Sequence, residues 1–342
     1  MSKAWGIFFC LFIYLNVFTQ TTDSIVVQGV NRSFVFYMPS TWNQSQQIPL
    51  LIVLHGLTQT GNGLMNITGF NTIAETNNFI VCYPDGINNS WNANMNVSVS
   101  QAEDLEFIEA LVAYFENNYN TDTYKRYLCG FSTGGFMCHK TVCESSLCFA
   151  GIASVSGNMS DTVYANCTNP NPLTSVLHIH GTTDPVVSYF GSSTTGVSVD
   201  STINKWRVFL SCDSVPSLVN MPNTNLLDLS FPEKYTYNNC SGKSLELIKI
   251  IGGGHQWPGI TTLVGGLGNI NMDFYSPQII WDFLDGKTCP LTSTTTENIF
   301  NENKKIFRII DLMGRDTNLK ENTPVLIIYE DGSVERHFKT SY

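Results

Sequence analysis

Residues 126–136 read RYLCGFSTGGF and carry, at 130–134, the pattern Gly-x-Ser-x-Gly. The apolar run before Ser132 is typical of a strand, and the residues after Gly134 continue as a helical stretch. A serine at such a turn is held in a strained backbone conformation, and flanking glycines remove Cβ atoms that would collide as the strand turns into the helix. The pattern therefore indicates a nucleophilic serine, Ser132, exposed at the carboxyl edge of a sheet.

Short apolar runs alternate with helical patterns on both sides of this turn, from about residue 25 to 286. This alternation predicts an α/β fold with a mostly parallel, doubly wound sheet. We expect strands at 25–29, 33–38, 50–54, 79–83, 126–131, 149–155, 175–180 and 245–251, and helices at about 101–117, 134–143, 199–210 and 276–285.

A serine hydroxyl needs a base to act as a nucleophile, and the base needs a carboxylate to orient it. In the α/β-hydrolase fold these residues follow in the order Ser, acid, His. Asp184 follows the strand-like run SVLHIHG, and His255 follows the run LELIKII in the loop GGGHQWPG. Both residues come after strand ends, on the edge that carries Ser132. We therefore predict a catalytic triad of Ser132, Asp184 and His255.

The oxyanion of the tetrahedral intermediate needs two backbone N–H donors. His55-Gly56-Leu57 follows the strand at 50–54, where this fold places its second oxyanion loop. We assign the donors to Leu57 and Thr133, with Gly56 permitting the close approach.

Two further histidines, His178 and His180, share one face of a predicted strand and could imitate a pair of metal ligands. Because no third ligand lies nearby in the sequence, we expect them to brace the core or a loop. We expect no metal and no organic cofactor.

With these residues assembled, the chain from about 25 to 286 resembles the secreted esterase family that contains polyhydroxybutyrate depolymerases and feruloyl esterases. The matching stretches are LLIVLHGLTQTGNG, FIVCYPDGINNSWN, GFSTGGFMC, FAGIASVSGNM, VLHIHGTTDPVV and IIGGGHQWPG. The resemblance implies Ser132 as nucleophile, Asp184 as acid and His255 as base.

The resemblance also implies a substrate: carboxylic esters of a polymer or its oligomers, either of polyhydroxybutyrate type or feruloyl and acetyl esters of polysaccharide. We expect Trp91 and Trp257 to stack against such a substrate, unless they are packed core aromatics. Two rival functions stay open, a peptidase on the same fold and a carbohydrate-binding or adhesive protein with a vestigial triad.

Charge and composition limit which partners and which cellular location we expect for the protein. Lys plus Arg is 18 and Asp plus Glu is 28, and the net charge of −10 disfavours a nucleic acid as partner. Lys3 and the apolar run 4–17 read as a secretory signal peptide over 1–20, too short for a membrane span. We therefore expect a secreted protein, outside the cell or at its surface, with no transmembrane segment.

Nine cysteines remain beyond the expected signal peptide, so disulfides are expected and at least one thiol stays unpaired. Cys212 and Cys240 bracket a polar excursion and are the expected bridge. Cys82 and Cys129 lie in apolar runs, where a buried free thiol is expected.

The residue composition of the chain changes after Gly286. We expect an esterase domain at 21–286, a linker at 287–300 and a β-rich segment at 301–342, with a hairpin-type turn at Glu330-Asp331-Gly332. The runs IIDLMGR and PVLIIYEDGSVER resemble a C-terminal sorting segment of the type IX secretion system of Bacteroidetes, which implies the secretion machinery as a partner. The alternative is a small β extension packed on the esterase.

Overall fold

The computed structural model describes residues 19–95, 100–168, 170, 173–261, 267–290, 306–311, 314–317 and 324–338. The predicted signal peptide therefore lies outside the described residues, except for its last two positions. The chain divides into two units, Met1–Cys289 and Pro290–Tyr342, and each is treated by itself below.

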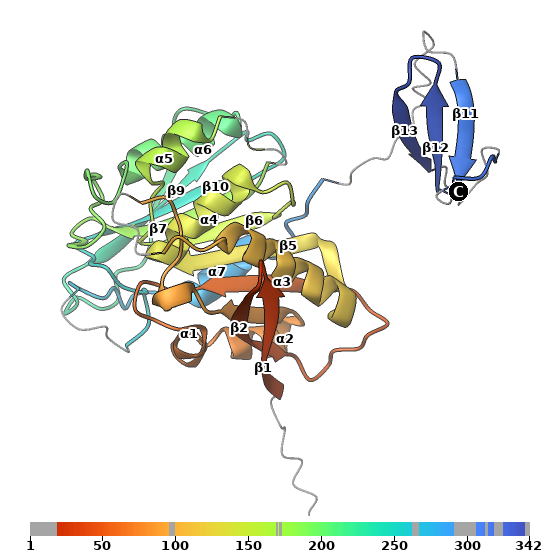
Figure 1. Ribbon diagram of the computed structural model, residues 1–342. Helices are drawn as coiled ribbons and strands as arrows, with labels where there is room; N and C mark the ends of the chain where they lie inside the picture. The colour runs from red at the N-terminus through yellow and green to blue at the C-terminus, as the bar shows by residue number, and fades with distance from the viewer. Residues whose placement is uncertain are drawn as a thin grey trace, which may run out of the picture. The chain divides into compact units, whose positions relative to one another are not determined.

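The first unit is built on one central sheet (Figure 1). The sheet has ten strands in the order β1-β2-β4-β3-β5-β6-β7-β10-β9-β8. Its six central strands, from β4 to β10, are parallel, and the strands at both edges pair antiparallel. The strands are β1 Thr19–Val27, β2 Val30–Met38, β3 Ile48–Leu54, β4 Ile80–Pro84, β5 Thr121–Phe131, β6 Gly151–Val155, β7 Ser175–Gly181, β8 Ser217–Asn220, β9 Phe231–Tyr237 and β10 Leu245–Ile251.

Helices cover both faces of this sheet. They are α1 Gly61–Thr68, α2 Phe70–Asn77, α3 Asp104–Tyr119, α4 Thr133–Glu144, α5 Asp161–Asn166, α6 Val199–Phe209 and α7 Ser276–Leu284, with a short 3₁₀ turn η1 at Ile87–Asn89. Within the described residues, no helix is both long enough and apolar enough to cross a lipid bilayer.

Successive residues of β3 separate into two hydrophobic cores because side chains alternate across a strand. Leu50, Ile52 and Leu54 join the core under α3, α4, α5 and α6. Leu51 and Val53 join the core under α1, α2 and α7. A strand buried on both faces reads as a continuous apolar run, which is why the sequence LLIVL indicates a strand.

All eight expected strands and four expected helices are present; the strand at 245–251 has the expected bounds, and the others differ at one or both ends. The expectation of a strand at 25–29 is wrong at its end, because Gln28 and Gly29 have φ of 48° and 79° and form the turn between β1 and β2. Strands β8 and β9 and helices α1, α2 and α5 are not among the elements expected from the sequence.

Three disulfides join described cysteines of the first unit: Cys143–Cys167, Cys148–Cys289 and Cys212–Cys240. Cys82, Cys129 and Cys138 are free and buried. Because Cys289 is bridged to Cys148, the first unit extends a little beyond the expected domain end at residue 286.

The second unit is an antiparallel sheet of β11 Ile306–Asp311, β12 Pro324–Tyr329 and β13 Val334–Phe338. Its small core contains Val325, Ile327 and Tyr329, with Ile309 packed against them. The turn expected at 330–332 joins β12 to β13, and the Tyr329 N–H donates to the Ser333 carbonyl across it.

Candidate active site

Ser132 occupies the turn from β5 into α4, with φ 53° and ψ −121°. Its N–H donates to the Val155 carbonyl of the neighbouring strand at 2.9 Å, which fixes the turn against the sheet. A Cβ atom on Gly130 would lie 2.3 Å from the carbonyl carbon of Gly134, so no larger residue fits there. The strained turn predicted from Gly-x-Ser-x-Gly is thus present, and it directs the N-terminus of α4 toward the serine.

Ser132, His255 and Asp184 form a continuous hydrogen-bonded series. Ser132 Oγ lies 2.9 Å from His255 Nε2, and His255 Nδ1 lies 2.7 Å from Asp184 Oδ2. The three residues follow the carboxyl ends of β5, β10 and β7, which are all parallel and end at one edge of the sheet. Their side chains are buried, so the contacts are made in a medium that screens charge weakly.

Hydrogen bonds hold both carboxylate oxygens of Asp184. Oδ1 accepts the N–H groups of Val186 and Val187 at 2.8 and 2.7 Å. Oδ2 accepts from His255 and lies 3.4 Å from Nε2 of His180. Burial acts to raise the pKa of Asp184, but the hydrogen bonds from His180 and His255 outweigh it and hold that pKa well below its usual range. The acid therefore stays ionised at neutral pH.

The backbone fixes the loop that carries His255. The His255 N–H donates to the Leu267 carbonyl at 2.7 Å, and the Gly254 N–H donates to the Asn269 carbonyl at 2.8 Å. Gly181 must be glycine, because a Cβ atom there would lie 2.2 Å from the carbonyl oxygen of Gly253. This contact brings the ends of β7 and β10 together and places the base beside its acid.

The loop after β3 lies directly against the nucleophile, since a Cβ atom on Gly56 would be 3.4 Å from Ser132 Cβ. The neighbouring N–H groups are already used: Gly56 donates to Gln59 Oε1 and Thr58 donates to the Asn89 carbonyl, both at 2.9 Å. The N–H of Leu57 has no acceptor in the part of the chain that the structure describes.

Thr133 is the first residue of α4, so its N–H has no acceptor within the helix. The two N–H groups expected to hold an oxyanion, those of Leu57 and Thr133, are thus both unengaged among the described residues.

His55 supports the loop after β3. Its Nδ1 lies 2.7 Å from the Gly56 carbonyl and its Nε2 accepts the Gly86 N–H at 2.9 Å, so the neutral ring carries its proton on Nδ1. Burial lowers the pKa of His55, which agrees with a neutral ring.

The two tryptophans proposed for stacking on substrate are both core residues. Trp91 is 1% exposed, and its Nε1–H donates to the His55 carbonyl at 2.8 Å. Trp257 is 4% exposed and packs on Phe131 and Phe70 with ring centroids 5.8 and 6.4 Å away. Neither ring face is open to a polymer in this structure. The alternative stated for both residues, packed core aromatics, agrees with this burial. Trp91 bonds the loop after β3 and Trp257 packs on Phe131, next to Ser132.

Gln59 and Leu267 were not singled out from the sequence, although they fix the loops of Gly56 and His255. No residue pattern could have indicated them, because Gln59 acts through a local side-chain contact within its loop and Leu267 acts through its backbone carbonyl.

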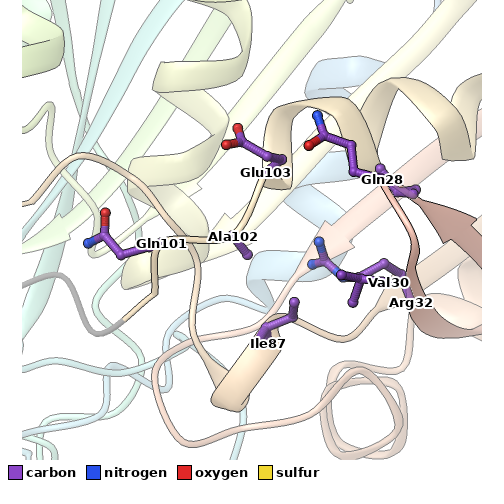
Figure 2. Close-up of a pocket in the computed structure, with 8 residues that line it drawn as sticks. Gln28, Val30, Arg32, Ile87, Gln101, Ala102 and Glu103 are labelled. Carbon is purple, nitrogen blue, oxygen red and sulfur yellow. The ribbon is translucent and has the colours of Figure 1, made fainter.

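A separate hollow of about 200 Å³ contains no residue of the series Ser132, His255, Asp184. Figure 2 shows its lining, which comes from the β1–β2 hairpin, η1 and the segment before α3. Its buried cation, Arg32, pairs with Asp104 at 2.5 Å and lies 4.0 Å over the ring of Phe107, while its Nε has no partner among the described residues. The hollow is lined by Val27, Gln28, Val30, Arg32, Ile87, Gln101, Ala102 and Glu103.

Residues 27–211 match the model of the Esterase family, described as "Putative esterase". The chain belongs to this family. It is 28% identical over 233 residues to the bifunctional acetylxylan esterase/xylanase of Neocallimastix patriciarum, a match that covers 67% of this chain and 31% of that protein. It is 28% identical over 181 residues to feruloyl esterase C of Emericella nidulans, covering 49% of this chain and 62% of the relative. The chain thus spans less than two thirds of the length of either relative.

Solved structures support the fold. The acetyl xylan esterase from Aspergillus awamori matches with a TM-score of 0.52 at 19% identity, covering 72% of this chain and 96% of that one. A thermostable esterase matches with a TM-score of 0.51 at 15% identity, covering 79% of this chain and 63% of that one. The predicted fold class, an α/β-hydrolase with a small β-rich C-terminal part, is confirmed.

Proposed function

We propose that this esterase hydrolyses carboxylic esters through an acyl-enzyme on Ser132. The observation that carries the proposal is the series Ser132–His255–Asp184, joined at 2.9 and 2.7 Å. A nucleophile, a base and an orienting carboxylate in contact are the parts that acyl transfer requires.

In the first half-reaction His255 Nε2 takes the proton of Ser132 Oγ while Oγ bonds to the carbonyl carbon. The carbonyl electron pair moves onto oxygen, and the N–H groups of Leu57 and Thr133 stabilise that oxyanion at the N-terminus of α4. Collapse breaks the bond to the alcohol oxygen, which receives the proton from His255. Asp184 remains ionised throughout and stabilises the transient imidazolium.

In the second half-reaction water attacks the acyl-enzyme. His255 takes a proton from the water and returns it to Ser132 as the serine leaves. The sum is one ester and one water converted to one carboxylic acid and one alcohol, with the enzyme unchanged.

For the substrate, we favour acetyl or feruloyl esters on a polysaccharide. The relatives named for acetylxylan and feruloyl esters support this choice. Exposed apolar side chains near the triad also support it: Leu57 and Val186 are 44% and 45% exposed and lie in the loops that carry an oxyanion donor and the acid. Such side chains suit the acyl group of a small or aromatic ester.

One panel tests the choice. Purified protein is offered acetylated xylan fragments, feruloylated fragments, hydroxybutyrate oligomers and nitrophenyl acetate. We expect turnover of the nitrophenyl ester and of at least one polysaccharide ester. Turnover of hydroxybutyrate oligomers alone would contradict the substrate while leaving the mechanism in place.

Ser132→Ala separates an active triad from a vestigial one. We expect the variant to keep its fold and to lose roughly 10⁴-fold or more in kcat. A fluorophosphonate probe should label the native protein and not the variant. A native protein that is neither labelled nor active on any ester would overturn the proposed function.

We also propose that the protein is exported, with residues 1–20 as a signal peptide and the segment after about 300 as a sorting address. Three disulfides in the first unit support an oxidising destination. The mass of protein recovered outside the native cell tests this: we expect a start near Thr21 and loss of most of the segment after about 300. A full-length chain outside the cell would contradict it.

A further inference from the structure

Asp184 has a second histidine neighbour besides its catalytic partner. His180 Nε2 lies 3.4 Å from Asp184 Oδ2 and 2.8 Å from the Val187 carbonyl oxygen. His178, two residues earlier on the same face of β7, places its Nε2 3.2 Å from His180 Nδ1, with the two rings parallel within 3°. Both rings are at most 1% exposed.

The contacts fix where the protons are. A carbonyl oxygen and an ionised carboxylate can only accept, so His180 Nε2 carries a hydrogen. Burial lowers the pKa of His178 well below its usual value, so this ring is neutral and carries one proton. Its Nδ1 has no partner among the described residues.

A proton on His178 Nδ1 would therefore be a buried donor without an acceptor, which is costly. The proton belongs on Nε2, where it is donated to His180 Nδ1. His180 is then the neutral ring protonated on Nε2. The alternative, a charged His180, would leave a donor on His178 unsatisfied and add a buried charge.

We propose that His180 is a positioning residue of the active site: its Nε2–H bonds the Val187 carbonyl and faces Asp184 Oδ2 at 3.4 Å, which keeps the carboxylate in line with His255, and His178 sets the tautomer that makes this possible. The inference rests on the proposed function, because it assigns a part in the same triad. His180 bonds the Val187 carbonyl, while the Val187 N–H bonds Asp184 Oδ1. One ring thus faces Oδ2 and ties down the turn that holds Oδ1.

Neutrality of His180 is part of the role. A cation beside Asp184 would compete with the imidazolium of His255 for the same carboxylate charge. A neutral donor orients the carboxylate without neutralising it, so the full charge remains to stabilise His255 as it takes the proton.

His180→Met removes the donor in similar volume, whereas His180→Gln keeps an N–H near the position of Nε2. We expect H180M to lose about 10- to 100-fold in kcat on nitrophenyl acetate, the usual cost of a misplaced catalytic group, with KM unchanged. H180Q should recover most of that loss. Fluorophosphonate labelling counts intact nucleophiles, so that kcat refers to folded protein.

The same two substitutions at His178 test its part in setting the tautomer. H178M cannot donate to His180 Nδ1 and should lower kcat in the same direction, whereas H178Q should not. His139 supplies a control of equal burial that packs on His178 without bonding it: the ring centroids are 5.7 Å apart, its Nδ1 accepts the Trp206 indole N–H at 3.1 Å, and no described hydrogen bond joins it to His178, His180 or Asp184. H139N keeps an acceptor for the indole and should leave kcat unchanged.

Nitrogen-15 NMR of the native protein tests the tautomer without any variant. We expect His180 protonated on Nε2 and bare on Nδ1. Finding the opposite tautomer or a His180 cation by NMR would overturn the inference. Folded H180M with the same kcat as the native protein would also overturn it. An equal loss in H180M, H180Q and H139N would also overturn it, because a merely structural role predicts that pattern. A native protein inert to every ester and to the probe would instead refute the proposed function.

Discussion

A Cβ atom on Gly134 would lie 2.3 Å from the carbonyl oxygen of Leu54, so the first turn of α4 rests directly on the end of β3. This contact joins the helix that follows the nucleophile to the strand that leads into the loop of Gly56 and Leu57. Because both partners are backbone atoms, neither can move aside without moving its element. The second glycine of the motif thus sets the distance between the nucleophile and the oxyanion loop.

Gly134→Ala should therefore separate α4 from β3 and displace Ser132 from Leu57. We expect a loss of about 100-fold or more in kcat, because a displacement of about 1 Å in the site has that effect. A matched control is Gly286→Ala, where φ is 74° but nothing lies within 4 Å of the new Cβ. That variant should lose about 1 kcal/mol of stability and no activity. Equal kcat in the two variants would contradict the role given to Gly134.

The low pKa of Asp184 makes a prediction about acid stability. A carboxyl whose pKa is lower in the folded state contributes stability above its unfolded pKa, near 3.9, and loses it as pH falls toward the folded value. In that window the unfolded chain binds one more proton, so stability falls by about 1.4 kcal/mol per pH unit from this residue alone.

Asp184→Asn replaces the titratable carboxyl with an amide, so this proton uptake no longer occurs on unfolding. Urea unfolding between about pH 2.5 and 6 should show a shallower decline of stability in D184N than in the native protein below about pH 4. Parallel curves would mean that Asp184 is not held ionised by its neighbours.

The disulfides should differ in their contribution to stability. Cys148–Cys289 spans a sequence separation of 141 and Cys212–Cys240 one of 28. On the chain-entropy model, these loops give about 5 and about 3.6 kcal/mol. The double variants C148S/C289S and C212S/C240S should therefore both unfold at lower urea, with the first more affected. The opposite order would show that strain or denatured-state structure, rather than loop length, decides.

The order of strand-end residues was enough to predict that Ser132, Asp184 and His255 come together, because in a parallel sheet residues after the carboxyl ends of neighbouring strands meet. The functions of Trp91 and Trp257 were harder to predict, since a loop position does not tell whether a ring faces solvent or core. Both rings turn inward, and Trp91 does so because the His55 carbonyl needs its N–H.

Elements without a strong pattern escaped prediction. All four residues of β8 are exposed, so it has no apolar alternation to recognise. In α1, glycines and asparagines dilute the helical pattern, and the helix is instead fixed by a Thr60 cap on the Gly63 N–H and by a left-handed Gly69 at its end. The pairing of Cys148 with Cys289 depends on the whole fold and could not follow from spacing.

The last prediction concerns the oxyanion donors. The geometry leaves the N–H of Leu57 unengaged beside Ser132 and leaves its side chain 44% exposed, so the backbone rather than the side chain should matter. Leu57 is not among the residues with positive φ, so the sign of its φ does not exclude the proline ring. Leu57→Pro deletes the N–H, and Leu57→Ala keeps it while removing the side chain.

We expect L57P to lower kcat by about 10²- to 10³-fold, the usual cost of one oxyanion donor, and L57A to stay within a few-fold of the native rate. KM should change little in L57P, because the donor bonds more strongly to the charged intermediate than to the neutral ester. Thr133→Ala extends the comparison. This variant also keeps its backbone N–H, so its kcat should be almost the same as that of the native protein. If L57A and L57P lost activity equally, the side chain would be the functional group and the oxyanion assignment would have to move to another donor.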